Sequence, residues 1–308
     1  MAQPGEIGGA PSIGENGSCG RAERRVAGRS AAQVVKLLFT DLDGTLLDRR
    51  LTLDPVDVEA AHRAQRAGNL VGIATGRMYR SALPYALQLE TRLPLICYQG
   101  ALIRELPGER GGEVLYRKEV PPEVALPVLE LAHRRGYSVN IYQDDELLVE
   151  AKNADVAFYT SVAQIEAVVA KDPPLEERLG KGSTKMTLVT ADLDRFPRLL
   201  AEVSELVGDR AEVTRSLVGF CEITARGVDK GEALLWLCRH LGVDRRQTIA
   251  LGDAPNDLPM LRAAGTAVAV EGAAEEVRAQ ASLLVPGPGR GGLAAALARL
   301  GMDGSRAS

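Results

Sequence analysis

The chain has 308 residues, of which 45% are hydrophobic and 25% charged, and its formal net charge at pH 7 is −4. This length can form one large domain or two modest ones around a sizeable core. The acidic balance argues against a nucleic acid or an anionic membrane as a partner, since either would call for a basic excess. No uncharged apolar run reaches the roughly 20 residues of a membrane helix, so we expect no membrane contact.

Residues 1–33 are rich in Gly, Ser and Ala and lack the apolar stretch of a secretory signal, so we expect a disordered extension. The cysteines show no C-x-x-C spacing, which indicates free thiols in a reducing compartment and argues against disulfides and zinc. The four cysteines are Cys19, Cys97, Cys221 and Cys238. We therefore expect a cytoplasmic protein.

Short apolar runs alternate with helical segments in the first and last parts of the chain. The runs "VVKLLFT", "NLVGIAT", "PLICYQG", "QTIALGD", "TAVAV" and "SLLV" have the length and composition of strands buried on both faces of a parallel sheet. Between the first two, "DPVDVEAAHRAQRAG" predicts a helix that begins after Asp54 and ends near Gly68. A second helix, "VDKGEALLWLCRHLG", opens with Asp229 and Glu232 at a capping-box spacing and ends at Gly242.

The middle of the chain, residues 121–222, has a different pattern. Two helical segments, "PEVALPVLELAHRRG" and "DLDRFPRLLAEVSELVG", occur among alternating strands such as "YSVNIYQ", "TKMTLVT" and "GFCEIT". This order favours helices packed on an antiparallel sheet. We predict an α/β fold: a Rossmann-like, doubly wound parallel sheet core formed by residues 34–120 and 223–303, with an inserted α/β domain over residues 121–222.

Three of the predicted strands end in polar residues. Asp41 follows "VVKLLFT", Thr75 ends "NLVGIAT" and Asp253 follows "TIALG". Ligands of an open parallel sheet bind beyond the carboxyl ends of its strands, so we expect these residues to converge. Taken singly, "DLDG" and "GDAPND" are also typical of turns, and Thr75 of a helix cap. An EF-hand loop is disfavoured, because Leu46 and Thr52 occupy the positions where it needs Gly and Glu.

The charges around this edge indicate a metal-dependent chemistry. Lys230 stands at a helix N-terminus, where a cation opposes the macrodipole at a cost of roughly 0.3–1 kcal/mol, so an anionic neighbour is expected. The carboxylates of "DLDG" and "GDAPND" repel one another unless a divalent cation neutralises them, and oxygen-only ligands favour Mg²⁺. A lysine and Mg²⁺ that face a nucleophilic carboxylate suit phosphoryl transfer through an aspartyl-phosphate.

Four motifs occur in order along residues 34–300: "FTDLDGTLL", "IATGR", "GVDKGEALLWL" and "GDAPNDLPML", the last followed by "AVAVEGAAEEVRAQA". In this order they resemble the motifs of the haloacid dehalogenase superfamily, and specifically of its Cof-type phosphatases. The resemblance implies that Asp41 is the nucleophile and Asp43 the general acid and base. It also implies Mg²⁺ bound by Asp41, Asp253 and the backbone carbonyl of Asp43.

The same resemblance implies the remaining site residues. Contacts to the substrate phosphate are implied for Thr75, Gly76, Lys230 and Asn256. Asp257 would support Lys230 or a metal-bound water, and the inserted domain would be a cap that closes over the site.

Two segments depart from the family pattern. Gln99-Gly100-Ala101 stands where Asn-Gly-Ala is usual, and "PGPGRGG" replaces a polar segment near the end. Both lie beside the expected site entrance, so they bear on substrate choice and leave the chemistry intact.

We therefore expect a Mg²⁺-dependent phosphatase that hydrolyses small phosphomonoesters, sugar phosphates or similar metabolites, with no nucleic-acid or membrane partner. A phosphomutase would share every motif and differ by returning the phosphoryl group to the substrate. A non-catalytic sugar-phosphate sensor would bind without turnover, and the presence of every catalytic residue argues against it. The pattern carries no information on the oligomeric state.

Overall fold

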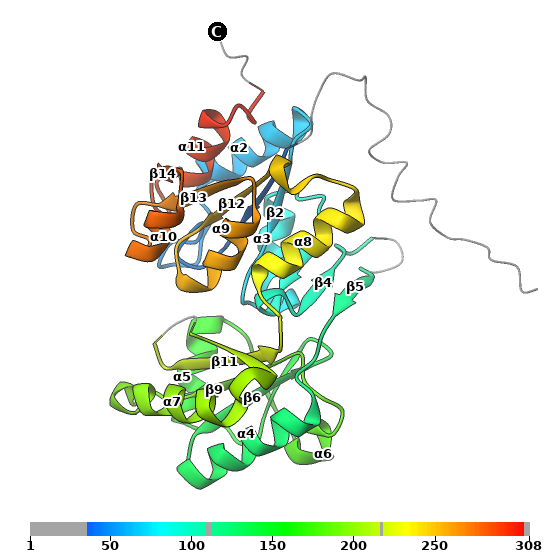
Figure 1. The fold of residues 1–308 in the computed structure, drawn as a ribbon, viewed down its shortest axis with the longest axis vertical. Coiled ribbons are helices and arrows are strands. Elements are labelled where there is room, and N and C mark those ends of the chain that lie inside the picture. Colours follow the sequence, from blue (N-terminus) through cyan, green and yellow to red (C-terminus); the bar gives the residue numbers. More distant parts are fainter. Residues whose placement is uncertain (1–35, 109–111, 216–217, 305–308) are drawn as a thin grey trace, which may run out of the picture. The chain divides into compact units, whose positions relative to one another are not determined.

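A five-stranded parallel sheet brings the first and last parts of the chain together (Figure 1). The computed structural model of the protein describes residues 36–108, 112–215 and 218–304. The strand order is β14-β13-β12-β1-β2, and each neighbouring pair is parallel, as predicted. The strands are β1 (Leu37–Thr40), β2 (Leu70–Ile73), β12 (Thr248–Gly252), β13 (Thr266–Val270) and β14 (Leu283–Val285).

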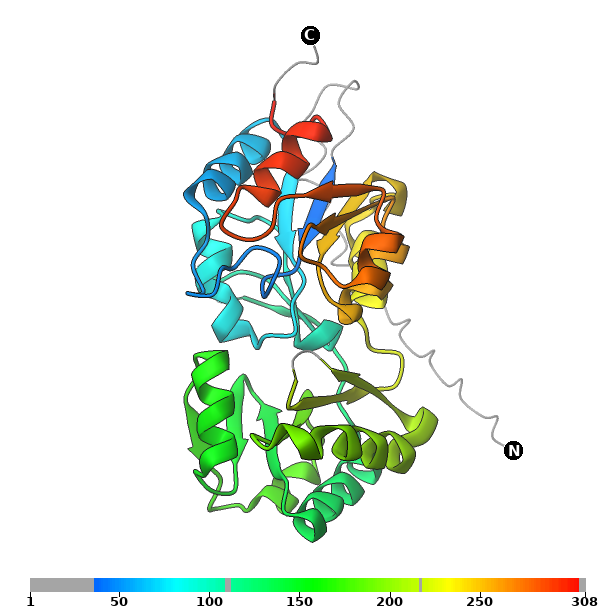
Figure 2. The ribbon, with the colours of Figure 1, turned by 90° about the vertical axis from the view of Figure 1, so that its left-hand side faces the viewer.

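Helices cover both faces of the parallel sheet. α2 packs against α11, while α8 packs against α9 and α9 against α10. Figure 2 shows these two groups on opposite sides of the sheet, which is the doubly wound arrangement that the sequence predicts. The helices of this part are α2 (Pro55–Arg66), α3 (Tyr79–Gln88), α8 (Lys230–Leu241), α9 (Leu258–Ala263), α10 (Glu275–Gln280) and α11 (Gly292–Arg299).

The predicted helix caps form. The side chain of Asp54 accepts a hydrogen bond from the Val56 N–H (2.9 Å) at the start of α2. Asp229 accepts from the backbone N–H groups of Gly231 (2.7 Å) and Glu232 (2.8 Å) at the start of α8. These two hydrogen bonds fix the first turn of the helix that carries Lys230.

The prediction for "PLICYQG" was wrong in its pairing. This strand, β3, meets the parallel sheet through one bridge between Ala74 and Ile96, and its regular pairing is antiparallel, with β4. The chain reverses between them at Tyr98 and Gln99, which both have positive φ. A tight reversal right after the strand places its successor beside it, and the sequence pattern did not reveal that turn. The strands of this second sheet are β3 (Leu95–Cys97), β4 (Leu102–Arg104) and β5 (Val114–Arg117).

The inserted region folds around a six-stranded sheet, called the cap sheet below. Its order is β10-β11-β9-β6-β7-β8, and every pair except β7–β8 is antiparallel. The two predicted helices, α4 (Pro122–Arg135) and α7 (Phe196–Val207), pack against each other and share a buried cluster with one face of this sheet. The strands are β6 (Ser138–Gln143), β7 (Glu146–Val149), β8 (Ala167–Val169), β9 (Lys185–Val189), β10 (Ala211–Arg215) and β11 (Phe220–Ala225).

Three elements of the cap were not predicted: α5 (Ala154–Ala163), β8 and α6 (Leu175–Leu179). They follow one another between β7 and β9. The last strand of the cap sheet, β11, runs to Ala225, so the sheet continues past residue 222, where we expected the insertion to end.

Two expectations concern residues that the structure does not describe, namely the extension over residues 1–33 and Cys19. Cys97, Cys221 and Cys238 are buried free thiols. Among the described helices, none has both the length and the apolar composition that crossing a membrane requires.

Candidate active site

The carboxyl ends of β1, β2 and β12 deliver three polar residues to one edge of the parallel sheet. β1 lies between the other two strands, and Asp41 follows it directly. The backbone N–H of Asp41 donates to the carbonyl of Leu251 (2.9 Å), which continues the pairing of β1 with β12. Asp253 follows β12 directly, and Thr75 follows β2 after one intervening residue, Ala74. The structure thus brings together the residues that the strand ends predicted.

Lys230 links two buried carboxylates at this edge. Its Nζ lies 2.7 Å from Oδ1 of Asp41 and 2.6 Å from Oδ1 of Asp257. Burial alone would lower the pKa of Lys230, but the charges of Asp257 and Asp41 raise it above its ordinary value, so the ammonium group stays charged. The lysine therefore has the anionic neighbours that its place at the start of α8 calls for.

Asp41 is held in a strongly perturbed environment. Burial raises its pKa well above the ordinary value, Lys230 opposes that shift, and the charges of Asp257, Asp253 and Asp43 add to it. Further positive charge close to this carboxyl group would favour its ionised form. A perturbed acid beside a lysine in the crevice of an α/β sheet is the pattern of a functional group.

The carboxylates of Asp41, Asp253 and Asp257 fit a divalent cation. One oxygen from each lies within 4.8 Å of the other two. Burial raises the pKa of Asp253 to about 6, against a hydrogen bond from Thr45 Oγ1 (2.7 Å), so a cation would relieve an existing repulsion. An all-oxygen donor set suits Mg²⁺.

Gly44 leaves room for the carboxylate of Asp253. A Cβ at Gly44 would lie 2.4 Å from Oδ2 of Asp253, and its φ of +81° disfavours any side chain. Asp257, for which we expected a supporting role, also fixes the loop after β12: its Oδ2 accepts from the backbone N–H groups of Asp253 (3.0 Å) and Ala254 (3.2 Å).

Arg77 holds the predicted general acid, and the sequence analysis did not assign it a role. Its Nε and Nη2 donate to the two oxygens of Asp43 at 2.7 and 2.5 Å, and its Nη1 donates to Ser81 Oγ (3.2 Å). Burial would lower the pKa of Arg77, but its hydrogen bonds to Asp43 raise it. A bidentate pair of this kind fixes both position and charge. The only sequence signal for this role of Arg77 was that the motif "IATGR" ends in arginine.

Thr75, Gly76 and Asn256 lie around the same edge. The Thr75 hydroxyl accepts from the Arg77 N–H (3.2 Å) and is buried. The Gly76 carbonyl accepts from Lys185 Nζ (3.0 Å) of the cap sheet. Asn256 Nδ2 donates to Gln99 Oε1 (3.1 Å), while its own Oδ1 is buried without a partner. Of the three, only Gly76 is contacted directly from the cap, by Lys185, while Asn256 contacts Gln99, whose amide also reaches Glu222 of the cap.

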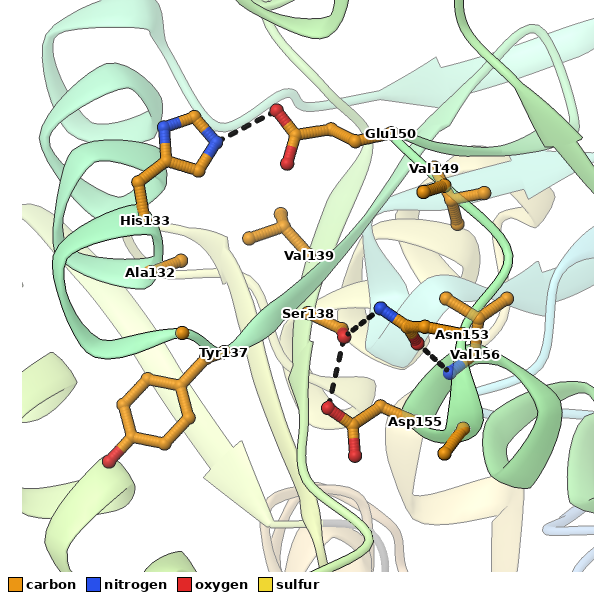
Figure 3. Close-up of a pocket in the computed structure, with 13 residues that line it drawn as sticks. Ala132, His133, Tyr137, Ser138, Val139, Val149, Glu150, Asn153, Asp155 and Val156 are labelled. Atoms are coloured by element: carbon orange, nitrogen blue, oxygen red, sulfur yellow. Dashed lines mark hydrogen bonds and ion pairs between the residues drawn. The ribbon is translucent and has the colours of Figure 1, made fainter.

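A pocket in the cap contains none of the predicted site residues (Figure 3). It lies between α4, β6 and the start of α5. Ser138 Oγ donates to Asp155 (3.0 Å) and accepts from Asn153 Nδ2 (2.9 Å), and His133 pairs with Glu150 (2.8 Å). These polar groups satisfy one another, so this pocket shows no sign of catalytic chemistry.

Comparisons with known proteins agree with this geometry. A family model described as haloacid dehalogenase-like hydrolase matches residues 38–297. An HMP-PP phosphatase from Escherichia coli O6:H1 is 30% identical over 80% of this chain and 88% of its own length. A 5-amino-6-(5-phospho-D-ribitylamino)uracil phosphatase from Bacillus subtilis is 27% identical over 79% and 88%. The structure of a subclass IIB sugar phosphatase superposes with a TM-score of 0.75 at 25% identity, covering 87% of this chain and 100% of that one.

Proposed function

The chain belongs to the haloacid dehalogenase-like hydrolase family, and from this premise we propose that it is a Mg²⁺-dependent phosphatase that hydrolyses small phosphomonoesters through an aspartyl-phosphate on Asp41. One observation carries the proposal: Asp41 is buried at the end of β1, hydrogen-bonded to Lys230 and close to a second and third carboxylate. That combination supplies a nucleophile and the positive charge that an entering phosphate requires.

In the first step an oxygen of Asp41 forms a bond to phosphorus, and the bond from phosphorus to the leaving oxygen breaks. Asp43 gives its proton to that oxygen as the alcohol departs. In the second step a water molecule gives a proton to Asp43 and attacks phosphorus, which releases inorganic phosphate and restores Asp41. Protons and bonds balance over the two steps.

The neighbouring residues hold the phosphate and the nucleophile in place. Lys230 and the Thr75 hydroxyl offset the charge of the phosphoryl oxygens. Mg²⁺ would be held by Asp41, Asp253 and the backbone carbonyl of Asp43, with Asp257 alongside, and would supply charge neutralisation and orientation when bound. Because Asp43 is tied to Arg77 in the structure, proton transfer requires its carboxyl group to leave the guanidinium.

The relatives support small phosphorylated substrates. Their printed names describe phosphatases of HMP-PP, of a phosphorylated ribitylaminouracil and of sugars. The insertion of a cap over the site also favours compact ligands, since closure excludes water from the reaction. We therefore place the substrate among sugar phosphates and similar metabolites.

The test is a phosphate-release screen over sugar phosphates, nucleotides, phosphorylated cofactors and phosphopeptides, with wild type and Asp41→Asn. We expect release from small phosphomonoesters that stops in EDTA, returns with Mg²⁺ and falls at least about 10²-fold in Asp41→Asn. Asp209→Asn, an exchange at an exposed cap residue, is the matched control.

The same screen separates the rivals. A phosphomutase would give an isomer without free phosphate, and a sensor would bind a sugar phosphate and release nothing. Activity on phosphopeptides alone, or full activity of Asp41→Asn, would contradict the proposal.

A further inference from the structure

The turn between β6 and β7 of the cap carries two neighbouring aspartates with different surroundings. Gln143 and Glu146 are the last paired residues of the two strands, so Asp144 and Asp145 form a two-residue turn. Both have a positive φ, 49° and 62°, which aspartate tolerates better than most residues and which is typical of tight hairpin turns. The side chain of Asp144 is 90% exposed, whereas that of Asp145 is only 13% exposed. The protein therefore holds one of the two against its surface.

Asp145 contacts the core through both of its carboxylate oxygens. Oδ2 accepts a hydrogen bond from the backbone N–H of Arg80 (2.9 Å), and Oδ1 accepts one from the Tyr98 hydroxyl (2.8 Å). The guanidinium of Arg80 lies nearby, with its Nε 3.6 Å from Oδ2. Burial and the charge of Asp145 raise the pKa of Tyr98 well above its ordinary value, so this hydroxyl keeps the proton that it donates. Each oxygen of one cap carboxylate thus has a donor in the core.

The first of these donors belongs to a helix that does not supply its own N-cap. α3 begins after Met78, whose side chain makes no capping hydrogen bond. The first N–H groups of a helix have no partner within it, so a side-chain oxygen usually accepts one of them. In α2 and α8 that oxygen comes from the residue directly before the helix, Asp54 or Asp229. In α3 it comes from Asp145, 65 positions away on the cap, which also places a negative charge at the positive end of the helix dipole.

The segment that Asp145 holds is part of the candidate active site. Residues 75–77 lie directly before the N-cap of α3, so the start of the helix fixes one end of this segment. The backbone N–H groups of Tyr98 and Gln99 donate to the carbonyls of its last and first residues, at 3.0 and 3.1 Å. Asp145 thus contacts both structures that hold the segment, namely the first turn of α3 and the turn at Tyr98.

We propose that Asp145 is a positioning residue: from the cap it fixes residues 75–77 and, through Arg77, the general acid Asp43. The inference rests on the proposed phosphatase function. Asp145 acts through other residues, since donors of the core occupy both of its oxygens. The groups that it positions act on the charge and the proton of the transition state, where a small displacement lowers the rate more than the affinity. Loss of Asp145 should therefore lower kcat and leave KM nearly unchanged.

The neighbouring aspartate provides a matched control. Asp145→Ala and Asp144→Ala place alanine at a positive φ in the same turn, so both variants share the backbone strain of the substitution. With p-nitrophenyl phosphate and the best sugar phosphate of the screen, Asp145→Ala should lower kcat about tenfold or more and keep KM within about twofold. Asp144→Ala should change neither constant. Asp145→Asn keeps one acceptor oxygen and should recover part of the lost kcat. Tyr98→Phe should lower kcat in wild type and add little to the loss in Asp145→Ala.

Hydrogen exchange gives a readout that does not depend on turnover. Mass spectrometry of the full chain should show faster amide exchange over residues 79–82 in Asp145→Ala than in Asp144→Ala. We expect a difference of about fivefold or more, because the N–H of Arg80 loses its acceptor and the first turn of α3 frays.

The outcomes separate the inference from the function on which it rests. Faster exchange with an unchanged kcat would make the contact a structural one and overturn the inference, while the phosphatase would stand. Equal losses of kcat in Asp144→Ala and Asp145→Ala, or a change in KM alone, would also overturn it. If wild type hydrolyses no phosphomonoester of the screen, the proposed function fails and takes the inference with it. Should Asp145→Ala not fold, Asp145→Asn and Tyr98→Phe decide the matter by the same two measurements.

Discussion

Replacement of Lys230 by methionine would leave two buried carboxylates without their shared cation. The ammonium group lies within 2.7 Å of Asp41 and 2.6 Å of Asp257, and its own side chain is completely buried. Removing one partner of a buried ion pair costs about 3–5 kcal/mol, because the remaining charge is left uncompensated. We expect Lys230→Met to lower the free energy of unfolding by about this amount at neutral pH in the absence of divalent cations.

The pH dependence of this loss identifies its cause. Lys230 is the group that lowers the pKa of Asp41, so without it burial and the neighbouring carboxylates raise that pKa further. A carboxyl group whose folded-state pKa is raised contributes stability that is fully present below its unfolded pKa and is lost as the pH rises through the folded value. The deficit of Lys230→Met against wild type should therefore be small at about pH 4 and large at about pH 8.

Urea unfolding in EDTA at both pH values, followed by the fluorescence of Trp236 on α8, measures the deficit. Lys152→Met, at an exposed position of the cap, is the matched control and should change stability little at either pH. Added Mg²⁺ should recover part of the lost stability, since a cation in the carboxylate cluster replaces the missing charge. A deficit of equal size at both pH values, or none at the higher one, would refute the reasoning.

Three further predictions concern the same edge of the sheet. Gly44→Ala should weaken Mg²⁺ binding at least tenfold in a calorimetric titration, because the added Cβ would lie 2.4 Å from Oδ2 of Asp253. Gly136→Ala is the control, since Gly136 has a similar positive φ but no neighbour within 4 Å of an added Cβ. The apparent Mg²⁺ affinity should fall below about pH 6, by up to about tenfold per pH unit. Burial raises the pKa of Asp253 to about 6, so below that pH a proton competes with the cation for this carboxylate. Titrations across this range that show no such fall would contradict Asp253 as a Mg²⁺ ligand. Arg77→Lys, which cannot form the bidentate pair with Asp43, should lower kcat about tenfold or more in steady-state assays, and an unchanged kcat would leave Arg77 without a part in positioning the acid.

The sequence predicted the core of the candidate site because that core depends on strand ends. Asp41, Thr75 and Asp253 each follow a buried apolar run, and parallel strands present their carboxyl ends at one edge of the sheet whatever the details of packing. Lys230 was open to prediction for a local reason, since a cation at the start of a helix requires an anion nearby. In both cases a short segment contains the physical reason.

The residues that sequence reasoning missed form pairs across long stretches of chain. Arg77 meets Asp43 from 34 positions away, and Lys185 meets Glu222 from 37 positions away. The alternation in "TKMTLVT" shows that Lys185 and Thr187 share a face of their strand, but not which face meets the core. The reversal after β3 was missed for a related reason: two of its three positive φ angles fall on Tyr98 and Gln99, residue types that do not signal a turn, and only the third falls on a glycine, Gly100.

The side chain of Gln99 connects the core with the cap. Its side chain bridges the core residue Asn256 and the cap residue Glu222, and it packs so close to Gly76 that a Cβ there would lie 2.4 Å from its Nε2. The asparagine usual at this position in the family is one methylene shorter, so it would not span the same two partners from the same backbone. The longer amide therefore links the carboxylate of Glu222 in the cap to Asn256 of the core. This departure from the family pattern lies where the cap and the core meet.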